Sequence, residues 1–81
     1  MTSHEKLRDL LMDVFLIEES EYSLELSQDD VETWDSMGLV AMAVGIEETF
    51  GYHFSQEEAF SIKKFRDTVD ILTSNGIPFD D

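Results

Sequence analysis

One serine stands where the chain passes from an acidic stretch into a long amphipathic run. Residues 34–38 read WDSMG, so Asp35 precedes Ser36 and Met37 and Gly38 follow it. Aspartate is a good N-cap residue, which predicts that a helix begins at Ser36. A hydroxyl there could act as a nucleophile, receive a group from another protein, or only help to cap the helix.

The surroundings of Ser36 do not fit a serine hydrolase. The hydrolase elbow reads G-x-S-x-G, and Trp34 occupies its first glycine position here. A serine nucleophile also needs a base, and nothing in the sequence couples His4 or His53 to Ser36. We therefore predict no catalytic residue. The residues alone leave open whether Ser36 is modified by another protein or serves only the helix start.

A dedicated metal site is not expected either. Acidic residues are dense just before the serine, at Asp29, Asp30, Glu32 and Asp35, but the EF-hand pattern is absent and the chain has no cysteine. Weak divalent binding that relieves the acidic repulsion is compatible with this pattern.

Charge and length limit the classes of function. The 81 residues carry 19 acidic against 5 basic side chains, a net charge of −14. Such a chain repels phosphate backbones and attracts basic protein surfaces, so we expect no nucleic-acid partner. The charged N-terminus is not a signal peptide, and no apolar stretch approaches the roughly 20 residues of a membrane span. We predict a cytoplasmic protein of one domain, residues 1–81, without membrane insertion.

Apolar spacing and capping residues predict an all-α fold, a four-helix bundle of three longer helices and one short one. Ser3 can cap the first helix, Gly51 can end the second, and Ser55 with Glu58 has capping-box spacing. The expected helices are residues 3–17, 36–50, 55 or 56 to 61, and 64–74, with a long ordered loop at 18–35.

The second helix has two unlike faces. Its core stripe is predicted to consist of Leu39, Met42, Ala43, Ile46 and Phe50. The opposite face carries Met37, Ala41, Val44 and Glu48, with Gly38 and Gly45 to one side. Two glycines in one helix indicate that something approaches its backbone closely, either another part of this chain or a partner. We favour a docking surface beside Ser36.

This arrangement resembles the acyl carrier protein family, including its peptidyl and D-alanyl carriers. DSM is similar to the family's attachment motif, DSMGLVAMAVGIEETFG to its second helix, and FSQEEAFSIKKFRDTVDIL to its last two helices. The resemblance implies that Ser36 receives a 4′-phosphopantetheine arm from coenzyme A, with Asp35 orienting the site. It implies a carrier, not an enzyme, whose arm holds an acyl or aminoacyl group as a thioester. The partner-binding residues that it implies are Met37, Gly38, Ala41, Val44, Glu47 and Glu48.

The implied partners are a phosphopantetheinyl transferase, a loading enzyme, and a downstream synthase or transferase of a fatty-acid, polyketide or related pathway; we expect a monomer. Because Gly38 and Ala41 stand where acyl carriers often have acids, docking should depend more on apolar contact around Met37 and Val44.

DSMG also resembles D-alanyl carriers, so a D-alanyl or peptidyl carrier is an alternative. An unmodified acidic adaptor is another, and it predicts that Ser36→Ala is harmless. Any sequestered cargo would lie among Leu39, Met42, Ala43, Ile46, Phe50, Ile62 and Leu72.

Overall fold

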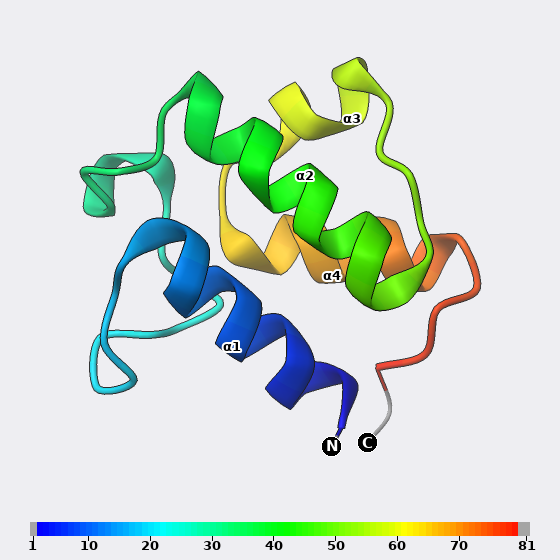
Figure 1. The fold of residues 1–81 in the computed structure, drawn as a ribbon, viewed down its shortest axis with the longest axis horizontal. Coiled ribbons are helices and arrows are strands. Elements are labelled where there is room, and N and C mark those ends of the chain that lie inside the picture. The colour runs from blue at the N-terminus through cyan, green and yellow to red at the C-terminus, as the bar shows by residue number, and fades with distance from the viewer. Residues whose placement is uncertain (1, 80–81) are drawn as a thin grey trace.

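Four α-helices and a long loop make up the computed structural model, which describes residues 2–79 (Figure 1). The helices are α1 (Ser3–Phe15), α2 (Ser36–Phe50), α3 (Gln56–Ser61) and α4 (Phe65–Ser74). Within the described residues there is no sheet, only an isolated bridge between Ser27 and Lys64. The predicted all-α class and the order of three longer helices and one short helix are confirmed. None of these helices is long and apolar enough to cross a membrane.

The capping residues set the bounds of α2 and α3 as predicted. The Asp35 carboxylate accepts the N–H of Gly38 at 2.8 Å, and Gly51 ends α2 in the left-handed conformation, with φ of 75°. Ser55 and Glu58 form the predicted capping box, so α3 begins at the next residue. These contacts satisfy N–H and C=O groups that a helix end would otherwise leave unpaired.

The first helix begins at Ser3 as predicted, but its capping residue and its end differ from the prediction. Ser3 is not the cap: the Thr2 hydroxyl accepts the N–H of Glu5 at 3.1 Å, and the Glu5 carboxylate accepts the N–H of Thr2. At the other end, the helix stops before the predicted Ile17. It stops because Leu16 takes the left-handed conformation, with φ of 57°, which reverses the chain.

The loop between α1 and α2 is ordered because it caps α4. Phe65 and Arg66, the first two residues of α4, donate their N–H groups to the carbonyl oxygens of Leu26 and Leu24 at 3.1 and 2.9 Å. The loop also contains a short 3₁₀ turn, Gln28–Asp30, which the sequence did not reveal. The predicted ordered loop is thus confirmed.

The basic residues at the start of α4 hold the same loop. Glu25 accepts the Arg66 Nε–H at 2.6 Å and lies 3.4 Å from Lys64 Nζ. The hydrogen bond from Arg66 is the main cause of a lowered pKa of the Glu25 carboxyl. These contacts explain why two cations are tolerated at the positive end of a helix dipole.

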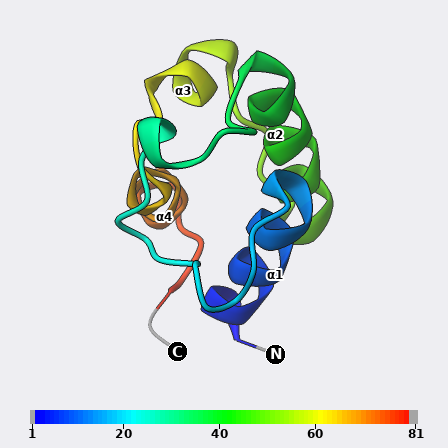
Figure 2. The same ribbon diagram turned by 90° about the vertical axis from the view of Figure 1, so that its left-hand side faces the viewer.

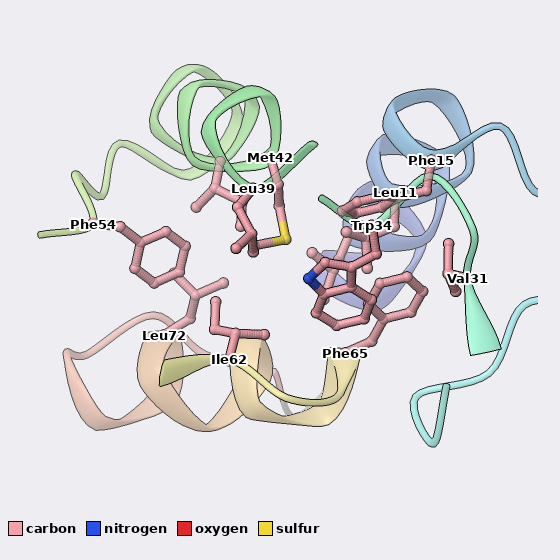
Figure 3. Packing of buried hydrophobic residues seen from close by; sticks show 12 residues of the cluster. Leu11, Phe15, Val31, Trp34, Leu39, Met42, Phe54, Ile62, Phe65 and Leu72 are labelled. Carbon is pink, nitrogen blue, oxygen red and sulfur yellow. The ribbon is translucent and has the colours of Figure 1, made fainter. Parts of the chain in front are cut away.

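The helices and the loop enclose one apolar core, with the loop closing the side that faces the viewer in Figure 2. Trp34, from the loop, stacks on Phe65 with ring centroids 4.9 Å apart and planes 12° apart. The predicted stripe of α2 faces this core (Figure 3). The buried apolar residues are Leu7, Leu11, Phe15, Val31, Trp34, Leu39, Met42, Ile46, Phe54, Ile62, Phe65 and Leu72.

The two glycines of α2 let α1 pack closely against it. The helices run in opposite directions (Figure 1), so that Gly38 faces Phe15 and Gly45 faces Leu10. A Cβ at Gly38 would lie 2.8 Å from the Thr33 carbonyl oxygen. The interpretation of these glycines as the mark of an approaching partner is wrong, because the chain itself covers that side.

Candidate functional site

Ser36 is the first residue of α2, and its side chain is exposed. The helix is capped by Asp35, whose carboxylate accepts a hydrogen bond from the N–H of Gly38. Within residues 2–79, the Ser36 hydroxyl makes no hydrogen bond. The hydroxyl is therefore not used for capping and is open to attack or modification.

The turn that presents Ser36 is held at two points. The Thr33 hydroxyl donates to the carbonyl oxygen of Phe15 at 2.6 Å, which ties the turn to the end of α1. Trp34 is buried and packs against the rings of Phe15 and Phe65, with ring centroids 5.4 and 4.9 Å from theirs. A buried indole two residues before the serine fixes the backbone while the hydroxyl points outward.

Neither histidine lies beside the serine. His4 Nε2 is 3.1 Å from the Phe79 carbonyl oxygen, and His53 Nδ1 is 2.7 Å from the Glu47 carboxylate. Glu47 follows Ser36 by 11 residues in α2, which is about 16 Å along the helix axis. In the described part of the chain, no group of three His, Asp or Glu side chains could hold a metal ion.

The predicted partner-binding residues fall into two groups. Met37, Ala41, Val44, Glu47 and Glu48 are exposed along α2. Met37 is the most prominent, with 80% of its surface accessible beside Ser36. Gly38 is half-buried against α1 and is not part of the exposed face.

The structure adds two apolar residues that sequence reasoning missed, Val40 and Phe60, both about half exposed or more. Val40 lies four residues from Ser36 and from Val44, a spacing that already indicates a shared face. Phe60 gave no signal, because α3 has six residues and is too short for its apolar pattern to be read.

Val40 and Phe60 border a groove of about 350 Å³ between α2 and α3. Its floor is made of Leu39 and Phe54, which are core residues. The groove is lined by Leu39, Val40, Ala43, Val44, Glu47, His53, Phe54, Ser55, Gln56, Ala59 and Phe60.

A hydrogen bond fixes the chain that leads into α3 and so the far wall of the groove. The Tyr52 hydroxyl donates to the Glu58 carboxylate at 2.7 Å, and Glu58 also accepts the N–H of Ser55. The backbone N–H of Ser55 is the main cause of a lowered pKa of Glu58, and the bond to Glu58 raises the pKa of Tyr52. The groove therefore has a rigid rim at its α3 side.

Comparison of the sequence with those of known proteins identifies the family to which the chain belongs. No family model matches the chain. An acyl carrier protein of Coprothermobacter proteolyticus is 37% identical over 71 residues, which are 88% of this chain and 87% of that protein. An acyl carrier protein of Petrotoga mobilis is 31% identical over 69 residues, 85% of this chain and 81% of that protein. With this identity over nearly the whole of both chains, the protein belongs to the acyl carrier protein family, whose members are non-catalytic carriers.

Proposed function

We propose that this protein carries an acyl or aminoacyl group as a thioester on a 4′-phosphopantetheine arm attached to Ser36. The observation that carries the proposal is the exposed Ser36 hydroxyl, at a helix start whose capping is already supplied by Asp35. When bound, the arm would supply a thiol, which this cysteine-free chain lacks. Family membership supports the same assignment.

In the attachment step, the Ser36 oxygen forms a bond to the phosphorus that bears the pantetheine of coenzyme A. The bond from that phosphorus to the bridging oxygen breaks, and adenosine 3′,5′-bisphosphate leaves with the electron pair. The serine proton passes to a base of the phosphopantetheinyl transferase. The positive end of the α2 dipole favours the phosphodiester charge, and Asp35 orients the first turn through its bond to Gly38.

Partner enzymes would dock on the exposed face of α2. This face combines apolar side chains at Met37, Val40 and Val44 with the carboxylates of Glu47 and Glu48. The apolar part gives contact area, and the acidic part attracts a basic partner surface. Gly38 is not part of this face; because it has no side chain, it allows α1 to pack closely against α2.

The docking hypothesis is tested with a charge placed in the apolar part and a charge reversed in the acidic part. We expect Val44→Asp to slow loading by the transferase more than Glu48→Lys does, because a charge in the apolar contact must be desolvated. Helix content of each variant is the control. If only Glu48→Lys slows loading, the apolar part does not dock the partner.

The proposal also includes the class of pathway in which the carrier acts. We favour fatty-acid, polyketide or related biosynthesis, with a loading enzyme and a downstream synthase or transferase as partners, and with the carrier acting as a monomer in the cytoplasm. A D-alanyl or peptidyl carrier is the alternative within the family, because DSMG at residues 35–38 also resembles D-alanyl carriers.

Attachment is tested by intact mass after incubation with coenzyme A and a broad-specificity phosphopantetheinyl transferase. We expect the wild type to gain one phosphopantetheine and Ser36→Ala to gain none. Ser20→Ala, which removes an exposed serine from the loop, is the matched control and should be modified normally. A folded wild type that gains no mass with two different transferases would favour the unmodified acidic adaptor.

A further inference from the structure

Two hydrogen-bond donors lie in the core without a good acceptor. Trp34 is 3% exposed, and its Nε1 is the one buried side-chain nitrogen or oxygen, within residues 2–79, that has no partner. Thr68 is fully buried, and its hydroxyl has only the Met42 sulfur at 4.0 Å. A thioether sulfur is a weak acceptor. Buried polar groups are usually satisfied, so two neighbouring exceptions need an explanation.

The two donors belong to one region of the core. Trp34 stacks on Phe65, and Phe65 and Thr68 are three residues apart on the same face of α4. In Figure 3 the indole nitrogen of Trp34 points toward the sulfur of Met42, the same atom that Thr68 approaches. Thr68 thus approaches the Met42 sulfur from α4, while the indole nitrogen of Trp34 is directed toward the same sulfur without bonding to it.

The groove between α2 and α3 leads toward this region. Leu39 and Phe54 form its floor and also belong to the core. Figure 3 shows Leu39 and Met42 on one side and Ile62 on the other, with the indole nitrogen lying beyond them. Met42, Trp34 and Thr68 do not line the groove itself, so an acyl chain reaches the two donors only by displacing the side chains of its floor.

We propose that Trp34 Nε1 and Thr68 Oγ1 form a contact point for an oxygen atom on the carried acyl chain. This inference rests on the proposed function, because it needs cargo on Ser36. A carbonyl oxygen has two lone pairs and can accept from both donors, whereas a saturated chain leaves both unpaired. The cargo class that fits is an acyl chain bearing a carbonyl or hydroxyl group along its length, in preference to a saturated chain.

The first test observes the indole directly. Ser36 is loaded with phosphopantetheine carrying amide-linked acyl chains of equal length, one saturated and the others with a single carbonyl at successive positions. Intact mass is measured first, so that failure of attachment counts against the proposed function and not against this contact. The chain has one tryptophan, so its indole N–H gives one proton resonance.

We expect one position of the carbonyl to move the indole resonance downfield and to slow its exchange with solvent. The saturated chain should leave the exchange rate as in the protein that carries the bare arm. Equal effects from saturated and oxygenated chains would overturn the inference, and so would a resonance that no chain moves.

The second test removes each donor. Protection of the thioester from hydroxylamine, relative to the same thioester on free pantetheine, measures how far the chain is sequestered. Trp34→Phe keeps an aromatic ring without the N–H, and Thr68→Val keeps the shape without the hydroxyl. We expect each to reduce the preference for the oxygenated chain by about tenfold, which corresponds to about 1.4 kcal/mol.

Tyr22→Phe is the matched control, because it removes a half-buried hydroxyl from another ring stacked on Phe65 and should keep the preference. If Trp34→Phe does not fold, Thr68→Val provides the same comparison. A preference that survives the loss of the hydroxyl in Thr68→Val, or of the N–H in a folded Trp34→Phe, would overturn the inference.

Discussion

Adding one methyl group at each glycine of α2 tests how the attachment site is held. At Gly38 a Cβ would lie 2.8 Å from the Thr33 carbonyl oxygen and 2.9 Å from a ring carbon of Phe15. At Gly45 it would overlap the end of the Leu10 side chain. A backbone oxygen and a buried ring move only with the surrounding structure, whereas half-buried Leu10 can change its rotamer. The two substitutions should therefore differ in effect.

The magnitudes follow from two opposing terms. Alanine in place of glycine favours a helix interior by up to about 1 kcal/mol. Overpacking a core costs about 1–3 kcal/mol. For Gly45→Ala these terms nearly offset each other, and we expect a free energy of unfolding within about 1 kcal/mol of wild type. For Gly38→Ala the clash dominates, and we expect a loss of about 1–2 kcal/mol.

Urea unfolding followed by helical circular dichroism measures both values, with an unchanged m-value as the check that the same transition is compared. A loss of 1–2 kcal/mol lowers Tm by roughly 4–16 °C in a domain of this size. Gly38→Ala should also load phosphopantetheine more slowly than Gly45→Ala, because Thr33 and Phe15 hold the turn before Ser36. A Gly38→Ala variant as stable as Gly45→Ala would refute the close approach of α1.

Three further substitutions test single features of the fold. Leu16→Gly should raise the free energy of unfolding by about 0.5–1 kcal/mol, because a left-handed conformation is strained for leucine, and thermal unfolding measures the gain. Thr68→Val in the unloaded protein should be as stable as wild type or more stable by up to about 1 kcal/mol, because the hydroxyl has only a sulfur acceptor; a clear loss in urea unfolding would mean that a better acceptor is present. Arg66→Gln tests the ion pair with Glu25, whose pKa is lowered in the folded protein mainly by the hydrogen bond from Arg66. The folded protein therefore keeps the Glu25 carboxylate ionised to lower pH than the unfolded chain does. The stabilisation that the ion pair gives is present above pH 4.5 and is lost as the pH falls through the lowered pKa. The variant should therefore have a lower Tm than wild type at neutral pH, the difference should close on acidification, and a difference that is constant with pH would contradict the assignment.

Local chemistry made α2 and α3 predictable from the sequence. Asp35 and Ser55 are strong capping residues placed directly before amphipathic runs, and Gly51 suits the left-handed end of α2. The end of α1 was not predictable, because Leu16 adopts a conformation that the sequence leads one to expect of glycine or asparagine. Its conformation follows from the chain reversal that the rest of the fold requires.

Contacts between distant segments account for the other errors. The side of Gly38 that faces α1 could not be assigned, since Phe15 lies 23 positions earlier in the chain. The approach of Thr68 in α4 to the Met42 sulfur in α2 likewise joins residues 26 positions apart in the chain. Periodicity reports which side of one helix is apolar, but it does not say which neighbour covers that side.

Because the loop caps α4, its hydrogen bonds also determine where a peptide can be inserted into the chain without disturbing the helices. Residues 18–22 form a turn bonded only within itself by its backbone, so a peptide tag inserted at Ser20 should leave the helices in place. Between Leu24 and Leu26 the same tag would remove the acceptors of the first N–H groups of α4. The loop thus contains a permissive site and, a few residues later, a site at which an insertion should fray the first turn of α4, which lies far along the chain.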